Sequence, residues 1–223
     1  MTPSLPAGSV IALLGAESTG KTELARALAT RLQQRGITST WVPEYLREWC
    51  VREGRAPQRE EQRAIADEQT RRIAEAARNG VVVADTTALS IAVYSDTLFA
   101  DASLYPGAVD AQCRYTITLL MALDLPWVDD GLQREGPQVR EPFDGRLRKA
   151  LNGAGIGYAV VHGTGVERLA SSWNAINSLI SRERPAGTSV RRGAASGWQW
   201  PCDKCSDPSC EHRLFSDLVA GRQ

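Results

Sequence analysis

The sequence has no excess of either charge and no long apolar segment. Its 26 Lys and Arg residues balance 26 Asp and Glu residues, so no net field draws the chain to nucleic acid or to an anionic membrane. The longest apolar run is far shorter than the roughly 20 residues that span a bilayer. Residues 1–9 lack the basic start and apolar centre of a signal peptide. These absences predict a cytoplasmic protein that binds no membrane, and they make nucleic acid an unexpected partner. They leave the oligomeric state open.

Cysteine is also scarce, with five residues in a chain of 223. Cys50 and Cys113 stand alone, and the other three lie close together near the end of the sequence. Because thiols are reduced in the cytoplasm, we expect no disulfide framework.

Residues 15–22 fit the pattern G-x-x-x-x-G-K-T of a phosphate-binding loop, or P-loop. The apolar run 10–14 before it predicts a buried strand, and leucines at every fourth position after it predict a helix. Two glycines let successive backbone N–H groups face one anion at a helix N-terminus. The loop therefore predicts binding of ATP or GTP. The residues expected at the phosphates are Gly15, Ala16, Glu17, Ser18, Thr19, Gly20, Lys21 and Thr22.

Strand and helix patterns alternate along the chain. This alternation predicts an α/β P-loop NTPase with a parallel sheet covered by helices on both faces. Strands are expected at 38–42, 81–84, 115–120 and 158–161, and helices at 57–78, 89–98, 143–151 and 164–180.

The sequence also predicts three regions. The P-loop domain should occupy residues 1–181, because the last helix has the clearest apolar stripe of the sequence. A linker rich in Arg, Pro, Gly, Ser and Ala follows at 182–197, and a short cysteine-rich tail at 198–223. The stripe consists of Val166, Leu169, Trp173, Ile176 and Ile180.

Four segments together resemble one family. They are the P-loop, Pro-Glu-Tyr-Leu-Arg-Glu at 43–48, Ala-Asp-Thr-Thr at 84–87 and Trp-Val-Asp-Asp-Gly-Leu at 127–132. From about residue 10 to 180 the chain looks like the ribosylnicotinamide kinase domain of NadR-type proteins, an AAA-like branch of the small-molecule P-loop kinases. The resemblance implies ATP-dependent phosphorylation of the 5′-hydroxyl of a ribonucleoside, namely nicotinamide riboside, to give nicotinamide mononucleotide.

Phosphoryl transfer needs a cradle for the triphosphate, a metal ion and a group that orients or deprotonates the acceptor. We expect Lys21 to reach the β- and γ-phosphates and Thr22 to ligate Mg²⁺. Asp85 follows a buried run, where a carboxylate is costly unless it is paired or metal-linked. It is expected to hold the Mg²⁺ shell or the ribose hydroxyls, or else to cap the next helix. Glu44 follows the second strand, at the sheet edge where ligands bind. The resemblance implies a catalytic carboxylate there, and the alternative is a surface or capping residue.

Four further residues are candidates for the acceptor site. Tyr45 and Trp127 are suited to stack on a cationic nicotinamide ring, although ordinary packing explains them equally well. Arg47 is suited either to phosphate or to pairing with a neighbouring Glu. By resemblance, Asp130 binds ribose hydroxyls.

Residues 129–140 are polar and have no buried periodicity, which predicts a mobile lid. Arg134 and Arg140 lie in it. A guanidinium on a closing lid stabilises the transferring phosphoryl group, and the alternative is a solvated charged loop.

The tail places four soft ligands within a segment too short to bury a core. A C-x-x-C pair followed by Cys and His is suited to tetrahedral Zn²⁺, although the spacing matches no common finger. The alternative is unligated thiols. The expected ligands are Cys202, Cys205, Cys210 and His212.

Two functions therefore compete. The first is the nucleoside kinase. The second is a regulatory ATP- or GTP-binding NTPase whose tail recruits a partner. The tail favours the second, as does the absence of an adenylyltransferase domain before the first strand, which NadR-type proteins usually carry. Glu44, Asp85 and residues 127–140 favour the first.

Overall fold

The computed structural model describes residues 5–128 and 137–183. At their centre lies a five-stranded sheet in the order β2-β3-β1-β4-β5, with every neighbouring pair parallel. This arrangement confirms the predicted parallel α/β sheet. The strands are β1 (Val10–Leu14), β2 (Ser39–Val42), β3 (Val81–Asp85), β4 (Ile117–Met121) and β5 (Ala159–Val161).

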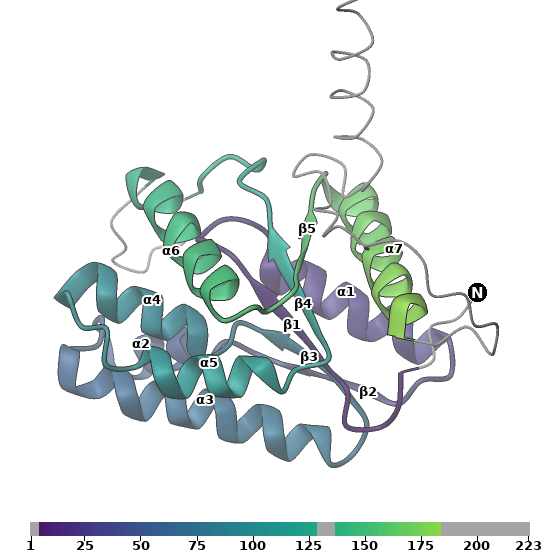
Figure 1. The fold of residues 1–223 in the computed structure, drawn as a ribbon, viewed down its shortest axis with the longest axis horizontal. Helices are drawn as coiled ribbons and strands as arrows, with labels where there is room; N and C mark the ends of the chain where they lie inside the picture. The colour runs from purple at the N-terminus through teal and green to yellow at the C-terminus, as the bar shows by residue number, and fades with distance from the viewer. Residues whose placement is uncertain (1–4, 129–136, 184–223) are drawn as a thin grey trace, which may run out of the picture.

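Helices connect successive strands and cover both faces of the sheet, as predicted (Figure 1). In the part of the chain that the structure describes, they are α1 (Lys21–Gln34), α2 (Tyr45–Glu53), α3 (Gln62–Ala77), α4 (Ala88–Phe99), α5 (Tyr105–Cys113), α6 (Arg140–Gly153) and α7 (Gly165–Glu183), with short 3₁₀ turns η1 (Arg59–Glu61) and η2 (Pro137–Val139).

The alternation of side chains along the strands divides the core into two layers. One face of the sheet packs against α1 and α7, with Leu28, Trp173 and Ile176 in its core. The other face packs against α2 to α6, with Leu89 and Phe143 in its core. In Figure 1, α1 and α7 accordingly lie on one side of the strands, and the remaining helices lie on the other side. Both faces being covered explains why β1, β3 and β4 are apolar at almost every position.

Several elements differ from the prediction, and α2 is a helix where the sequence predicted none. α5 was not predicted, because Pro106 and Gly107 in its first turn are typical of a loop, and only three of its residues are buried. α3 begins at Gln62 rather than at residue 57, since the Glu61 carboxylate accepts a 2.7 Å bond from the backbone N–H of Gln58 and holds a 3₁₀ turn before it. Val166 was wrongly placed on the buried stripe of α7. It is 83% exposed because it lies in the first turn, whereas Trp173 and Ile176 are buried as expected.

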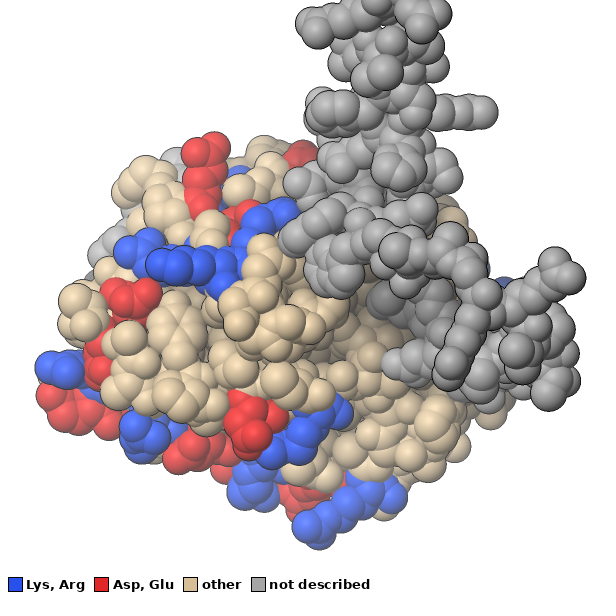
Figure 2. All heavy atoms as spheres, viewed as in Figure 1, with Lys and Arg blue, Asp and Glu red and all other residues tan. Residues whose placement is uncertain are grey.

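The described residues carry both charge signs on the face that Figure 2 shows. On the face seen in Figure 2, acidic and basic side chains are interspersed, and on α3 many of them form i,i+3 or i,i+4 pairs such as Arg71 with Glu68 and Glu75. Within the described ranges, no helix is both long enough and apolar enough to cross a membrane.

Candidate functional site

The P-loop turns sharply between β1 and α1. The backbone of Gly15, Ser18 and Gly20 has positive φ angles of 150°, 54° and 75°. A Cβ atom on Gly15 would lie 2.8 Å from the Cβ of Met121 at the end of β4, a distance at which something must move. The Thr19 hydroxyl donates a 2.8 Å bond to the carbonyl oxygen of Ala16 and closes the loop. Glycine is therefore required where the loop passes β4, and the loop forms a nest at the N-terminus of α1.

Lys21, the first residue of α1, folds back over this loop. Its ammonium donates to the carbonyl oxygens of Gly15 at 2.9 Å and of Ala16 at 2.7 Å. The charge therefore lies directly above the nest, where a terminal phosphate of a bound nucleotide is expected.

Two buried carboxylates lie near each other beside the P-loop, and Asp85 is the one close to this ammonium. The register of β1 with β3 pairs Leu13 with Asp85, so Asp85 lies beside the start of the P-loop. Asp85 is 1% exposed, and Glu44, which follows β2, is 6% exposed. Burial raises the pKa of Asp85, and the negative charge of Glu44 raises it further. The charge of Lys21, a hydrogen bond from the Thr22 hydroxyl and the charge of Arg47 act in the opposite direction. The structure thus brings together five side chains that the sequence had assigned to one site.

The capping alternative does not apply to either carboxylate. Glu44 is at the N-cap of α2, but its side chain makes no capping hydrogen bond. α4, which follows Asp85, is capped by Thr87, whose hydroxyl accepts a 3.3 Å bond from the N–H of Leu89. Arg47 has its Nε atom 3.9 Å from a Glu44 oxygen, which is a long ion pair. Neither carboxylate therefore serves as a helix cap.

Tyr45 is the first residue of α2 and is partly buried. Its ring is covered by Arg72, whose guanidinium carbon is 4.3 Å from the ring centroid, and its hydroxyl accepts a 3.5 Å bond from Arg52. Tyr45 is thus engaged between arginines at the surface and does not line the cavity described below.

The segment that follows β4 contacts the P-loop directly. The Ser18 hydroxyl donates to the carbonyl oxygen of Val128 at 2.8 Å, and the Val128 N–H lies 3.2 Å from the same hydroxyl. Trp127, half-buried, is held next to the loop by these bonds. Asp130 and Arg134 lie outside the described residues.

A cavity of about 450 Å³ opens next to the P-loop. Its walls come from four helices as well as from the loop, and they are mostly apolar. Such a cavity is large enough for a small nucleoside, and Ala16 and Glu17 of the P-loop form part of its wall. Among its lining residues are Ala16, Glu17, Leu46, Gln62, Tyr94, Leu98, Arg140 and Phe143.

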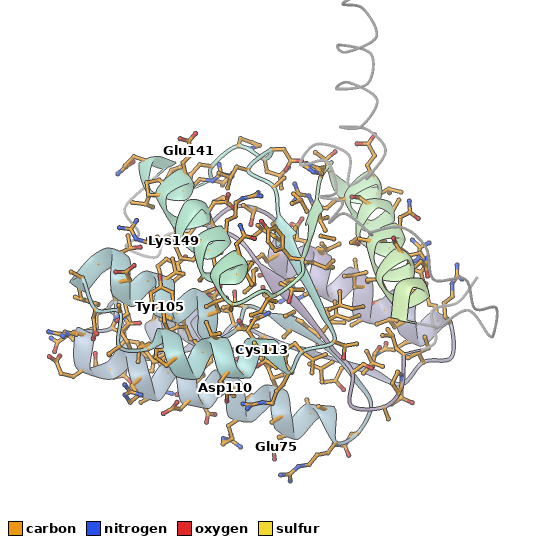
Figure 3. The ribbon with its side chains drawn as sticks, in the orientation of Figure 1. Glu75, Tyr105, Asp110, Cys113, Glu141 and Lys149 are labelled. Carbon is orange, nitrogen blue, oxygen red and sulfur yellow. The ribbon has the colours of Figure 1, made fainter. Side chains whose placement is uncertain are left out.

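Arg140 lines this cavity, and its expected place in a mobile lid was wrong, as was the alternative of a solvated charged loop. Residues 137–139 form η2, and Arg140 is the first residue of α6 and is only 8% exposed. The next residue, Glu141, points outward from the same end of the helix (Figure 3). Helix geometry explains the contrast, since neighbouring residues on a helix lie on different faces. The rest of the predicted lid, residues 129–136, lies outside the described residues.

Sequence reasoning missed a buried arginine behind the P-loop. Arg168 of α7 is 3% exposed, and its guanidinium donates to the carbonyl oxygens of Thr19 at 2.6 Å and of Gly163 at 2.7 Å. Its third partner is the carboxylate of Asp124, which also accepts a 2.7 Å bond from the N–H of Gly163. This network connects the P-loop with the loops after β4 and β5. In sequence, Arg168 appears only as one charge in the first turns of an amphipathic helix, so no local signal indicates it.

The residues predicted to hold Mg²⁺ fit a hard cation. The Oδ1 atom of Asp85 is buried without a hydrogen-bond partner, and the Thr22 hydroxyl is next to the same carboxylate. A hydroxyl and a free carboxylate oxygen are the donors that Mg²⁺ accepts beside nucleotide phosphates. The tail ligands proposed for Zn²⁺, Cys202, Cys205, Cys210 and His212, lie outside the described residues. In the described part of the chain, no group of three or more His, Cys, Asp or Glu residues has the geometry of a metal site.

The sequence matches a known protein family over the region that contains the P-loop and the sheet. A family model described as an AAA domain matches residues 10–168, which is more than half of the chain. The chain belongs to this AAA domain family. The matched region of the AAA domain runs from the start of β1 to Arg168, so it contains the whole of the site just described.

Solved structures share this AAA-domain fold. A NadR protein in complex with NR matches with a TM-score of 0.61 and 21% identity over 83% of this chain and 53% of that one. A NadR protein in complex with NAD and AMP-PNP matches with a TM-score of 0.62 and 19% identity over 84% and 52%. Deoxyadenosine kinase from M. mycoides, with dCMP and dCDP bound, matches with a TM-score of 0.54 and 14% identity over 76% and 99%. The chain spans about half the length of the NadR structures. No curated protein matches the sequence significantly.

Proposed function

We propose that this AAA-domain chain is a P-loop kinase that transfers the γ-phosphoryl group of ATP to the 5′-hydroxyl of a ribonucleoside, with nicotinamide riboside as the first acceptor to test. One observation carries the proposal: two buried carboxylates, Glu44 and Asp85, lie near each other, and Asp85 lies near the Lys21 ammonium, at the edge of the sheet beside the P-loop. A protein that only bound nucleotide would not need a second buried carboxylate at this place, because burying an ionised group is costly.

The similar folds favour a nucleoside as acceptor. The NadR protein of similar fold was solved with NR, and the deoxyadenosine kinase with nucleotide products. The cavity of about 450 Å³ beside the P-loop is large enough for one nucleoside.

Each group then has a role that its position allows. The P-loop N–H groups and Lys21 hold the phosphates of ATP. Thr22 and Asp85 would hold Mg²⁺, which supplies charge neutralisation between the β- and γ-phosphates when it is bound. Glu44 accepts the proton of the acceptor hydroxyl as the hydroxyl oxygen bonds to the γ-phosphorus, and the bond from that phosphorus to the bridging oxygen of ADP breaks.

The raised pKa of Asp85 matters for this scheme. Its neighbours oppose each other, because burial and Glu44 favour the protonated acid whereas Lys21, Thr22 and Arg47 favour the carboxylate. A cation bound between Thr22 and Asp85 would also favour the carboxylate form of Asp85. We therefore expect Mg²⁺ binding to weaken as the pH falls, because protonation of Asp85 removes a ligand charge.

The test is a screen of nucleosides for ADP release with the purified chain in the presence of ATP and Mg²⁺. Turnover with nicotinamide riboside, giving a product heavier by one phosphoryl group, would support the proposal. The Lys21→Ala protein is the control for contaminating kinases. ATP hydrolysis that no acceptor accelerates would contradict the proposal and would favour the regulatory NTPase.

A further inference from the structure

A buried glutamine lies between the two strand ends that carry the carboxylates. Gln69 of α3 is 0% exposed. Its Oε1 atom accepts a 2.7 Å bond from the backbone N–H of Tyr45. Its Nε2 atom donates to the carbonyl oxygens of Pro43, at 3.3 Å, and of Thr86, at 3.4 Å. One side chain thus bonds the backbone on both sides of Glu44 and also the segment that follows β3.

The orientation of this amide follows from its partners. The NH₂ group has two hydrogens and lies beside two carbonyl oxygens, whereas the amide oxygen lies beside a single N–H donor. Exchanging the nitrogen and the oxygen would place oxygen against oxygen and N–H against N–H, so all three bonds would be lost. Gln69 therefore has one arrangement in which both of its polar atoms are bonded.

The pairing of β2 with β3 ends before the two carboxylates. The last pair of this ladder is Val42 with Ala84. The next residue after β2, Pro43, has no N–H and cannot extend the ladder. Asp85, by contrast, is still paired with β1. Gln69 therefore connects the two segments at the point where the hydrogen bonds between β2 and β3 stop.

The segment after β3 has an unusual backbone conformation. Thr86 has a φ angle of +81°, in the left-handed region that β-branched residues rarely adopt. Such a conformation is costly, and it persists where the surrounding structure holds it. The Thr86 N–H donates a 3.1 Å bond to the carbonyl oxygen of Leu13, and its own carbonyl oxygen accepts from Gln69. The strained residue is thus held by β1 on one side and by Gln69 on the other.

Position 69 belongs to the buried stripe of α3. Ile65 and Ile73, four residues before and after it, are each 1% exposed and lie in apolar clusters. An apolar side chain would serve the packing of the helix here, and a buried amide is costly unless it is hydrogen-bonded. The bonds of Gln69 go to the residues next to the carboxylates and not to its own helix. A polar residue in a core position is a local exception of the kind that functional sites require.

We propose that Gln69 is a positioning residue of the kinase, which holds the backbone of Glu44 in place next to Asp85 and so keeps the Glu44 carboxylate at the acceptor hydroxyl. Gln69 bonds backbone atoms, so it acts on turnover through Glu44. This inference rests on the proposed function in one respect, namely that Glu44 accepts the proton of the acceptor. Positioning has a large effect on rate, because a catalytic group displaced by about 1 Å loses about a hundredfold.

The kinetic test is a double-mutant cycle, measured by ADP release with the acceptor nucleoside, ATP and Mg²⁺. Gln69→Met keeps the length of the side chain but removes all three bonds. We expect kcat to fall by at least about tenfold, and the affinity for AMP-PNP to stay within about twofold, because the bonds of Gln69 do not involve the P-loop. In the Glu44→Gln background the same substitution should cause less than about a twofold further loss, because the positioned group no longer acts. Losses that multiply in the double variant would overturn the inference.

Gln112→Met is the matched control. Gln112 of α5 is 1% exposed, and its amide accepts from the Thr87 hydroxyl at 2.7 Å and donates to the Thr118 hydroxyl at 2.9 Å. It equals Gln69 in type and burial, but it bonds side chains instead of the backbone around Glu44. Both substitutions should lower the melting temperature, whereas Gln112→Met should keep kcat within about threefold. An equal loss of kcat in the two variants, assayed well below their melting temperatures, would show that Gln69 serves the fold alone.

A second measurement needs no turnover. The backbone N–H of Tyr45 donates to Gln69, so its hydrogen exchange, followed by NMR, reports on this contact. Gln69→Met should speed the exchange of this N–H by at least about tenfold, and Gln112→Met should leave it unchanged. Gln69→Asn provides a milder variant if Gln69→Met does not fold. Its amide is one methylene shorter and cannot reach both segments, so kcat should still fall by at least about fivefold.

The outcomes distinguish this inference from the proposed function. An unchanged exchange rate of the Tyr45 N–H in the Gln69 variants would overturn it, and so would wild-type kcat in Gln69→Asn. A wild type that phosphorylates no nucleoside would refute the proposed function, and hydrogen exchange would still decide whether Gln69 holds the segment around Glu44.

Discussion

The Arg168 guanidinium donates a 2.6 Å hydrogen bond to the carbonyl oxygen of Thr19, a residue 149 positions earlier in the sequence. This bond ties the middle of the P-loop to α7. A loop whose N–H groups must all point at one anion depends on where its carbonyl groups point, and Arg168 fixes one of them from behind. Arg168 thus acts through the loop rather than on the nucleotide, and it is a positioning residue.

Replacing Arg168 should affect both stability and nucleotide binding. Arg168→Met leaves Asp124 and two carbonyl oxygens without their donor, so we expect the free energy of unfolding to fall by about 2–4 kcal/mol. Arg168→Lys should recover part of the stability but not the geometry of three bonds. Urea unfolding and AMP-PNP titration measure the two effects. Arg114→Met, which removes an exposed pair with Asp110, is the control and should change stability by less than about 1 kcal/mol. A fully stable Arg168→Met protein with normal nucleotide affinity would contradict the positioning role.

Asp85→Asn should stabilise the protein while removing Mg²⁺-dependent turnover. Since the pKa of Asp85 is raised in the folded state, the folded protein holds this proton more tightly than the unfolded chain does. The ionised carboxylate therefore lowers stability above the raised pKa, and this cost disappears as the pH falls below the ordinary Asp value. Asn removes the cost, so the gain, on the order of 1 kcal/mol, should be present at neutral pH and should vanish in acid. Thermal unfolding of both proteins across pH is the measurement. A stability gain from Asp85→Asn that grows as the pH falls would show that the pKa of Asp85 is not raised in the folded protein.

Glu44→Gln and Lys21→Ala should separate catalysis from nucleotide binding. Gln keeps the size of Glu44 but cannot accept the hydroxyl proton, so Glu44→Gln should bind AMP-PNP normally and lose at least about a hundredfold in kcat. Lys21→Ala removes the charge over the P-loop and should lose both binding and turnover. Near wild-type turnover by Glu44→Gln would exclude Glu44 as the base.

Gly15→Ala should disrupt the P-loop. The new Cβ atom would lie 2.8 Å from the Met121 Cβ, and φ at this position is +150°. Strain and overlap together should cost at least about 2 kcal/mol and should abolish nucleotide binding. Gly36→Ala is the matched control, since Gly36 also has positive φ, at +77°, but nothing lies within 4 Å of its added Cβ. Gly36→Ala should lower the free energy of unfolding by about 1 kcal/mol and leave nucleotide binding intact. Equal effects of the two substitutions would show that contact with Met121 is unimportant.

Much of the fold could be predicted from the sequence because the sheet is buried on both faces. Strands such as β1 and β3 are therefore continuous apolar runs, and the P-loop motif requires a turn and a helix directly after β1. α5 could not be predicted, because Pro106 and Gly107 are typical of a turn and only three side chains of the helix are buried. Val166 was misplaced because a helical stripe does not reveal where the helix leaves the sheet.

The site residues that directly follow β-strands could be predicted from the sequence. Glu44 and Asp85 follow β2 and β3, so they were expected together at one edge. Gln62, Arg140 and Arg168 were harder, because each is a polar residue in a helix, where exposure is the usual expectation. Only packing in three dimensions shows that these three are buried, and only the count of their hydrogen bonds separates Arg168, with three partners, from Arg140, whose Nε and Nη2 have none.

The parallel direction of all five strands has a practical consequence. Each strand ends at the edge that carries the P-loop and the carboxylates, so each begins at the opposite edge. Gly8, before β1, lies at that far edge, where its N–H donates a 3.0 Å bond to the carbonyl oxygen of Gly80, before β3. A dye or a surface tether coupled ahead of residue 5 would leave the nucleotide edge unobstructed. Single-molecule or immobilised assays of ligand entry are therefore best built from that end.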